Sequence, residues 1–182
     1  MIHVKGSVNI NASPEQVFVL LSDARQCAEL NPRIEVIDIA TEPAGELRQG
    51  SIFHYRIVVE GRMTEYSSRV LSYEPDQSLE VQTDTDPVVN IKYKITPDGE
   101  GAILEQVLTS SAAERRSEPV EYPGWFSRLV DRLVKTPQSP EEDAVLRRKD
   151  EAIVQEQLQS QLDEWLMIIK KYLEDQRSKF MA

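Results

Sequence analysis

Side chains that can form hydrogen bonds recur at inward-facing positions of the strands that the sequence predicts. If Val70 faces inward, the two-residue period of a strand places Thr64, Tyr66 and Ser68 on the same face. Other strands and the last helix add further members to this set: Tyr55, Tyr93, Gln106 and Trp165. A few hydroxyl and amide groups in an apolar pocket fix the pose of a bound molecule by hydrogen bonding. The competing interpretation is that these groups pair with one another or with the backbone.

Groups that could catalyse a reaction are few. Arg56 and Arg69 could stabilise an enolate if they pointed into a pocket, because a fixed cation stabilises developing negative charge. Strand alternation instead places both arginines opposite the apolar side chains, which favours solvated cross-strand pairs with Glu60 or Glu65. The chain has only two histidines, and no Ser/His/Asp or Cys/His arrangement can be recognised from them. Whether the protein is an enzyme therefore stays open.

The single cysteine, Cys27, limits several kinds of site. It cannot form an internal disulfide, and without a cluster of Cys and His we expect no metal site. We also expect no cofactor. On a predicted short helix, a lone cysteine is more typical of a buried small residue than of a reactive thiol.

Composition excludes some classes of partner. The 182 residues carry 21 Lys and Arg against 31 Asp and Glu, a net charge of −10, so we expect no binding to nucleic acid or to anionic lipid through charge. A hydrophobic content of 40% is enough for a packed core. No apolar run approaches the roughly 20 residues of a membrane-spanning helix, and no signal peptide is recognised. We therefore expect a cytoplasmic protein without a membrane span.

The first 32 residues predict a strand followed by two short helices. Residues 2–11 place apolar or small side chains at every second position, as in a strand with one wet face. Ser13 and Gln16 can form a capping box, and Pro14 suits the first turn of a helix. A second helical turn is expected over 25–30, ending before Asn31 and Pro32.

Residues 34–109 predict six further strands, because short alternating segments are separated by turn-forming residues. Six strands in succession indicate an antiparallel meander.

After it, residues 113–140 change character and contain an amphipathic segment with Trp125, Phe126 and Leu129 on one face. This segment could pack on the core, cover a cavity as a lid, or contact another protein or a membrane surface. From 141 to about 177 nothing interrupts a helical pattern, and its apolar stripe lies in the second half: Val154, Leu158, Leu162, Trp165, Leu166, Ile169, Tyr172 and Leu173.

Several local stretches resemble the START and polyketide cyclase/dehydrase (SRPBCC) superfamily. They include the opening segment from Val8 to Phe18, the Val70 to Pro75 stretch, and the Trp165 to Leu173 stretch. The resemblance covers residues 2–112 and 153–175, whereas 113–140 departs from it. It implies an α+β helix-grip fold, with a curved antiparallel sheet of about seven strands wrapped around a long C-terminal helix and two short helices after the first strand. The whole of 1–182 would form one domain with an insertion at about 113–140 and an extended helix at about 141–177.

The resemblance also implies an apolar cavity between sheet and helix. We therefore expect a protein that binds a hydrophobic small molecule or lipid, for sequestration or transport, with Tyr55, Tyr66, Ser68, Tyr93, Gln106 and Trp165 as candidate ligand-binding residues. One alternative is a polyketide cyclase/dehydratase-like enzyme acting on a carbonyl substrate. Another is a protein-interaction module that uses the segment around 125–133.

Overall fold

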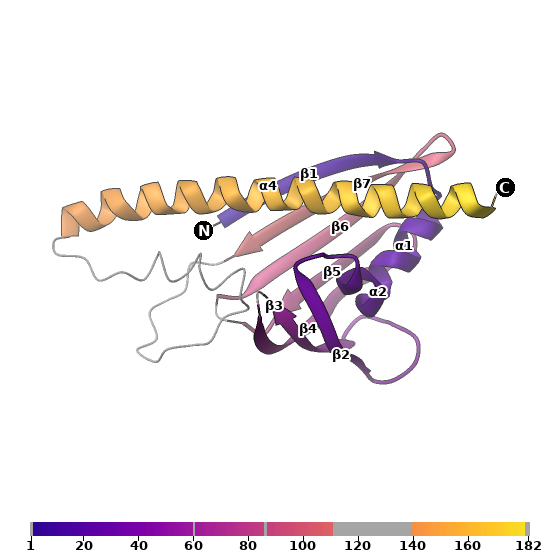
Figure 1. Cartoon of the computed structure of the whole chain (residues 1–182), viewed down its shortest axis with the longest axis horizontal. Helices are drawn as coiled ribbons and strands as arrows, with labels where there is room; N and C mark the ends of the chain where they lie inside the picture. The colour runs from indigo at the N-terminus through magenta and orange to yellow at the C-terminus, as the bar shows by residue number, and fades with distance from the viewer. Residues whose placement is uncertain (1, 60, 86, 111–139, 181–182) are drawn as a thin grey trace.

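The computed structural model describes residues 2–59, 61–85, 87–110 and 140–180 (Figure 1). Seven strands form one antiparallel sheet in the order β1-β7-β6-β5-β4-β3-β2. Their bounds are β1 Ile2–Ile10, β2 Ile34–Glu42, β3 Ile52–Val59, β4 Arg62–Glu74, β5 Ser78–Thr83, β6 Val89–Asp98 and β7 Gly101–Ser110. The sheet curves, and a long helix lies along it beside β1 (Figure 1). The predicted α+β helix-grip architecture and its antiparallel meander are confirmed.

Two short helices, α1 (Pro14–Ser22) and α2 (Ala24–Glu29), follow β1 as predicted. The capping box is present: the Gln16 amide N–H donates to Ser13 Oγ, and Ser13 N–H donates to Gln16 Oε1 at 2.9 Å. Asp23 caps α2 by accepting from the amide of Gln26. Side chains of α1 then reach the core with Val17 and Leu20 almost fully buried, because apolar residues recur at helical spacing.

The last helix, α4 (Pro140–Phe180), is 41 residues long, or about 60 Å at the rise of an α-helix. Its first turns extend past the sheet in Figure 1. In its second half the side chains that the sequence placed on the apolar stripe are buried or half-buried against the sheet, and the buried ones are Val154, Leu158, Leu162, Leu166, Ile169 and Leu173.

Strand β1 is an edge of the sheet, and α4 covers that edge with polar side chains. Gln159 donates to the carbonyl oxygen of Lys5 at 2.9 Å, and Lys170 donates to that of Asn9 at 2.6 Å. The amide of Asn11 donates to Glu174 at 2.9 Å, which lowers the pKa of that carboxyl. These backbone groups, which could otherwise pair with another strand, thus form hydrogen bonds with side chains of α4.

Helix and strand approach closely at Gly6. A Cβ atom at this position would lie 2.7 Å from Leu166 Cδ1 on α4. That distance is shorter than any ordinary carbon contact, so the small residue permits the helix to pack directly on β1.

Candidate ligand-binding site

A cavity of about 250 Å³ lies between the concave face of the sheet and α4. Strands β2 to β7, the two short helices, the connection from α2 to β2, and α4 all contribute to its wall. Most of the wall is apolar, and typical apolar members are Leu21, Phe53, Leu79, Val81, Ile91 and Leu108. A cavity of this kind follows from the fold, because a curved sheet leaves space that one helix does not fill.

The structure brings all six candidate residues together on this wall: Tyr55, Tyr66, Ser68, Tyr93, Gln106 and Trp165. They come from β3, β4, β6, β7 and α4. Thr64, which alternation also placed inward, does not line the cavity. It lies near the start of β4, where it pairs in register with Ile57.

Aromatic rings form part of the wall. Tyr55 and Tyr66 are register partners on adjacent antiparallel strands, and their rings stack with centroids 4.6 Å apart and planes 7° apart. Phe53 extends the group, with its ring centroid 6.2 Å from that of Tyr55. Facing pairs on neighbouring strands bring large side chains into contact in this way.

The tyrosines and the cysteine on the cavity wall are held in their neutral forms. Burial raises the pKa of Tyr55 to about 12, and the nearby Ser68 hydroxyl opposes part of that rise. Burial likewise raises the pKa of Tyr66 and of Tyr93 well above the usual value, with the Trp165 indole beside Tyr93 opposing part of the latter shift. Burial also raises the pKa of Cys27 to about 12. At neutral pH these groups supply no general base, because none of them ionises there.

The Cys27 thiol is half-buried and lines the cavity. With its raised pKa it is protonated at neutral pH and is a poor nucleophile. This agrees with the prediction that Cys27 packs as a small side chain and does not act as a reactive thiol.

Within the described part of the chain, two buried polar atoms on the wall have no hydrogen-bond partner: Ser68 Oγ and Gln106 Oε1. Ser68 is 3% exposed and Gln106 is 4% exposed. Thr83, also on the wall, differs because its hydroxyl lies 2.6 Å from that of Thr85 and accepts from the amide of Val89 at 3.0 Å. Buried polar atoms almost always have partners, so the two unpaired ones mark a place where the protein alone does not complete its hydrogen bonding.

Two polar contacts join the α2 region to α4. Arg33, in the connection from α2 to β2, donates to Glu164 of α4 at 2.7 Å. Gln26 of α2 donates to the hydroxyl of Tyr172 of α4 at 2.9 Å. These contacts hold the α2 region against the long helix.

The outer face of the sheet carries the arginines that were considered as catalytic groups. Arg56 pairs with Glu65 across β3 and β4 at 2.8 Å, as expected from alternation, and Arg69 is exposed on the same face. The preference for a solvated surface role over a role in the cavity is therefore confirmed.

The outer face also holds an arrangement that sequence inspection missed. His54 Nδ1 lies 3.0 Å from Ser67 Oγ, and His54 Nε2 lies 3.1 Å from Glu42 Oε2. These residues lie on adjacent strands, so only the register brings them together. The amide of Ser67 donates to Asp84, so it is not free to stabilise an oxyanion. We interpret the group as surface hydrogen bonding that links three strands.

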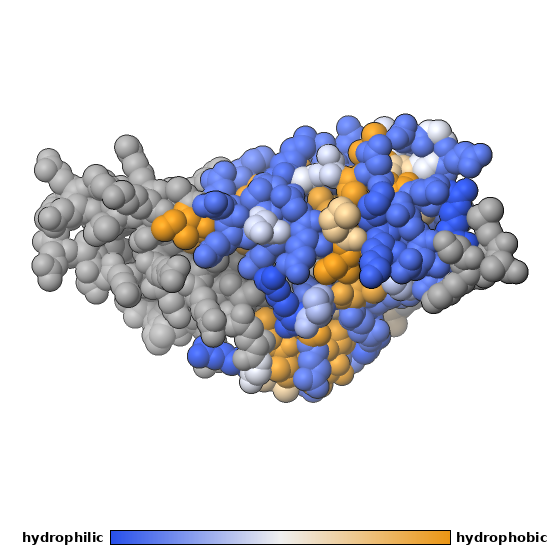
Figure 2. Space-filling view, turned by 45° about the horizontal axis from the view of Figure 1, so that its top comes forward, coloured by the Kyte–Doolittle hydropathy of each residue, from blue (hydrophilic) through white to orange (hydrophobic). Residues whose placement is uncertain are grey.

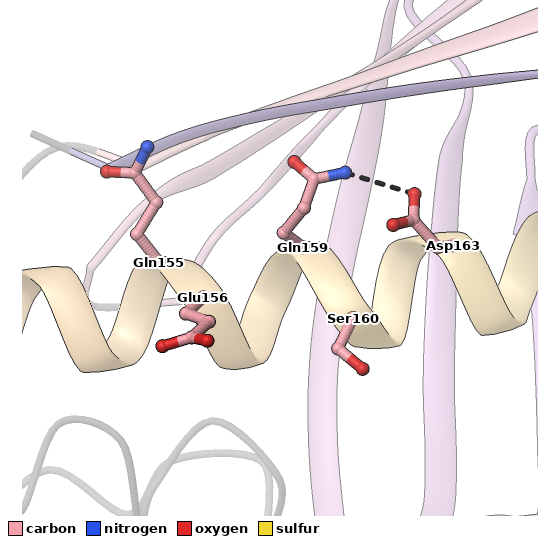
Figure 3. Close-up of a pocket in the computed structure, with 5 residues that line it drawn as sticks. All are labelled: Gln155, Glu156, Gln159, Ser160 and Asp163. Carbon is pink, nitrogen blue, oxygen red and sulfur yellow. Dashed lines mark hydrogen bonds between the residues drawn. The ribbon is translucent and has the colours of Figure 1, made fainter.

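A separate open groove lies along α4 (Figure 3). Its described lining comes from this helix alone, with Gln155, Gln159 and Asp163 on one side and Glu156 and Ser160 on the other. Gln159 donates to Asp163 at 3.0 Å and also covers the edge of β1. These side chains therefore already have a structural role.

On the face shown in Figure 2 the described surface is mostly hydrophilic, with hydrophobic side chains gathered in its lower middle. Large exposed hydrophobic side chains come from several elements and include Val19, Met63 and Met167. Exposed apolar residues of this kind are ordinary on protein surfaces. Among the described residues, no helix is long and apolar enough to cross a membrane, and no group of three or more His, Cys, Asp or Glu side chains could hold a metal ion.

The segment predicted at about 113–140, with Trp125, Phe126 and Leu129, lies almost entirely outside the described residues.

A family model described as "Polyketide cyclase / dehydrase and lipid transport" matches residues 1–160. A search of curated proteins found no significant match.

Solved structures share the fold at low sequence identity. A polyketide-cyclase-like protein from Corynebacterium glutamicum is 21% identical, with 94% of this chain and 91% of that chain covered and a TM-score of 0.57. The di-domain ARO/CYC protein StfQ of the steffimycin biosynthetic pathway is 15% identical, with 97% and 52% covered and a TM-score of 0.65. This chain thus spans about half of StfQ. The Aha1 dimer from Colwellia psychrerythraea is 12% identical, with 96% and 97% covered and a TM-score of 0.56. These likenesses establish the fold alone.

Proposed function

The chain belongs to the polyketide cyclase/dehydrase and lipid transport family, and from this premise we propose that it binds a small hydrophobic molecule in the cavity between the sheet and α4. Sequestration or transfer of that molecule is then its function. The observation that carries the proposal is an apolar cavity whose tyrosines and cysteine are all held neutral. Such a site can hold a ligand, but it lacks an acid and base matched to neutral pH.

The cavity volume narrows the kind of ligand. About 250 Å³ lies just below the roughly 300–1,000 Å³ typical of pockets for drug-sized ligands. A compact molecule of one or a few rings suits this volume better than a lipid with two acyl chains.

Native mass spectrometry of freshly purified protein, followed by organic extraction, tests the proposal directly. We expect a bound small molecule or, after extraction, an empty protein that binds the neutral fluorescent ketone prodan with a blue-shifted emission. Val81→Phe projects a ring into the cavity and should weaken prodan binding at least about tenfold, since overpacking leaves no room for the probe. Val88→Phe, at an exposed position outside the wall, is the matched control. Equal prodan binding by the two folded variants, or no binding by the wild type, would contradict the proposal.

A cyclase or dehydratase activity is the second candidate. It is supported by the three neutral tyrosine hydroxyls on the wall, since a phenol can donate a hydrogen bond to a substrate carbonyl. StfQ, which is described as a di-domain ARO/CYC protein, shares this fold. Incubation with a poly-β-ketone separates the candidates: an enzyme forms cyclised product faster than buffer does, and Tyr66→Phe or Tyr93→Phe slows it. A carrier binds the compound without increasing its conversion.

A further inference from the structure

We infer that Ser68 and Gln106 select the ligand, and that the ligand is an uncharged molecule bearing a polar group, such as a ketone or a phenol, that hydrogen-bonds to them. This inference rests on the proposed binding function. It goes further by assigning the recognising residues and by excluding ionised ligands such as carboxylates.

Ser68 and Gln106 face the same cavity from different strands. Ser68 lies on β4 and Gln106 on β7, which are separated in the sheet by β5 and β6. The curvature of the sheet places both on the cavity wall, where they are 3% and 4% exposed. Two deeply buried side chains from separate strands of the sheet thus line one cavity.

Among the described residues, neither Ser68 Oγ nor Gln106 Oε1 has a hydrogen-bond partner, although the Ser68 hydroxyl lies near enough to Tyr55 to oppose part of the rise in its pKa. A ligand carbonyl can accept from the Ser68 hydroxyl and from the NH₂ group of the Gln106 carboxamide, and a ligand hydroxyl can in addition donate to Gln106 Oε1. A ligand that completes these bonds gains them without displacing an internal protein bond, whereas the satisfied Thr83 offers no such gain.

The remaining wall explains why the ligand is uncharged. Arg33 is the cation among the described lining residues, and it already pairs with Glu164 at 2.7 Å near the rim. The interior tyrosines and Cys27 are neutral. Binding of an ionised carboxylate would remove its hydration without supplying an unpaired cation from the described lining residues, so its binding free energy would be strongly unfavourable.

Three probes with one ring system test this selection by fluorescence titration: prodan, the corresponding dimethylaminonaphthoate anion, and dimethylaminonaphthalene without a carbonyl. We expect the wild type to bind prodan at least about tenfold more tightly than either of the others, the effect of one or two additional hydrogen bonds. Ser68→Ala and Gln106→Leu should each remove most of the preference of prodan over the hydrocarbon. Ser67→Ala and Gln82→Leu, neighbouring changes on strands β4 and β5 outside the cavity wall, should leave it unchanged.

Thermal unfolding of the empty variants supplies a second readout. Because Ser68→Ala and Gln106→Leu remove unpaired buried atoms, their Tm should equal or exceed that of the wild type even though prodan binds more weakly. A lower Tm with an unchanged probe preference would assign both residues a structural role and overturn the inference.

Other outcomes are also decisive. Tight binding of the naphthoate, or equal binding of all three probes, would overturn the inference and leave the proposed binding function intact. Failure of all three probes to bind the folded, extracted protein would overturn the proposed function, and the inference with it.

Discussion

Arg33 and Glu164 form an ion pair of 2.7 Å that joins the connection between α2 and β2 to α4, and both residues contribute to the cavity wall. Their side chains remain about half exposed, at 45% and 53%. An exposed pair of this type contributes only about 0–1 kcal/mol to stability. Because both side chains line the cavity, we expect the pair to affect ligand exchange more than folding.

Glu164→Gln is therefore expected to change the free energy of unfolding by less than about 1 kcal/mol while increasing the rate of prodan dissociation severalfold. Stopped-flow displacement of prodan measures the rate, and urea unfolding measures the stability. The wild-type rate should rise with salt, which screens the pair, and the rate of the variant should not. Glu156→Gln, on the same helix away from the cavity, is the control. Identical dissociation rates for wild type and Glu164→Gln would show that the pair does not restrain exchange.

The stacked rings of Tyr55 and Tyr66 give a separate prediction about stability. Tyr66→Ala should lower the free energy of unfolding by about 2–4 kcal/mol, because it removes a large side chain from the cavity wall together with its aromatic contact. Tyr66→Phe keeps the ring and should lose less than about 1 kcal/mol. Urea unfolding compares the two. A similar loss for both would mean that the hydroxyl, not the stacked ring, stabilises this wall.

Tyr66→Phe also tests the proposed role of the hydroxyl in the cavity. If that hydroxyl contacts the ligand, prodan binding should weaken severalfold while the stacked ring is retained. An unchanged affinity in the folded variant would remove Tyr66 from the proposed site.

The buried tyrosines predict a loss of stability at alkaline pH. Their pKa values are raised in the folded protein, to about 12 for Tyr55, above an unfolded value near 10. Between these values the unfolded chain binds fewer protons than the folded one, so stability is fully present below pH of about 10 and decreases as pH rises toward about 12. Absorbance of tyrosinate should show part of the titration coinciding with unfolding. Tyr66→Phe should make the decrease shallower, and a decrease that is equally steep in this variant would contradict the assignment.

Gly6 predicts the sensitivity of helix packing. Gly6→Ala places a methyl group 2.7 Å from Leu166 Cδ1, and overpacking of this kind costs about 1–3 kcal/mol. The double variant Gly6→Ala with Leu166→Val should lose less than the sum of the two single losses, because the shorter side chain makes room. Ser7→Ala, on the exposed side of β1, serves as the control. Strict additivity in urea unfolding would mean that the two residues do not compete for the same space.

Local patterns were sufficient to predict much of the fold. The capping box of Ser13 and Gln16 depends on residues three positions apart, so the sequence alone locates the start of α1. Alternation separates Ser68, inside the cavity, from Ser67, outside it, because successive strand residues point to opposite faces. The uninterrupted helical pattern predicts a last helix at about 141–177, and α4 spans Pro140–Phe180.

Thr64 shows where alternation stops being informative. It shares a face with Ser68, yet the cavity does not extend that far along β4, and strand periodicity carries no information about where a cavity ends. The Ser67–His54–Glu42 hydrogen bonds likewise depend on the register of three strands, which alternation does not determine.

By itself, then, the sequence determined the elements and the face on which each residue lies, because capping and periodicity are local properties of the chain. Only the tertiary structure decided which buried groups are paired. Gln106 and Thr83 are both polar residues on inward faces, yet the Thr83 hydroxyl forms hydrogen bonds with Thr85 and the amide of Val89, while Gln106 Oε1 has no hydrogen-bond partner among the described residues. Hydrogen bonds act over about 3 Å, so they depend on how distant segments are brought together, and this distinguishes a polar group that completes the fold from one available to a ligand.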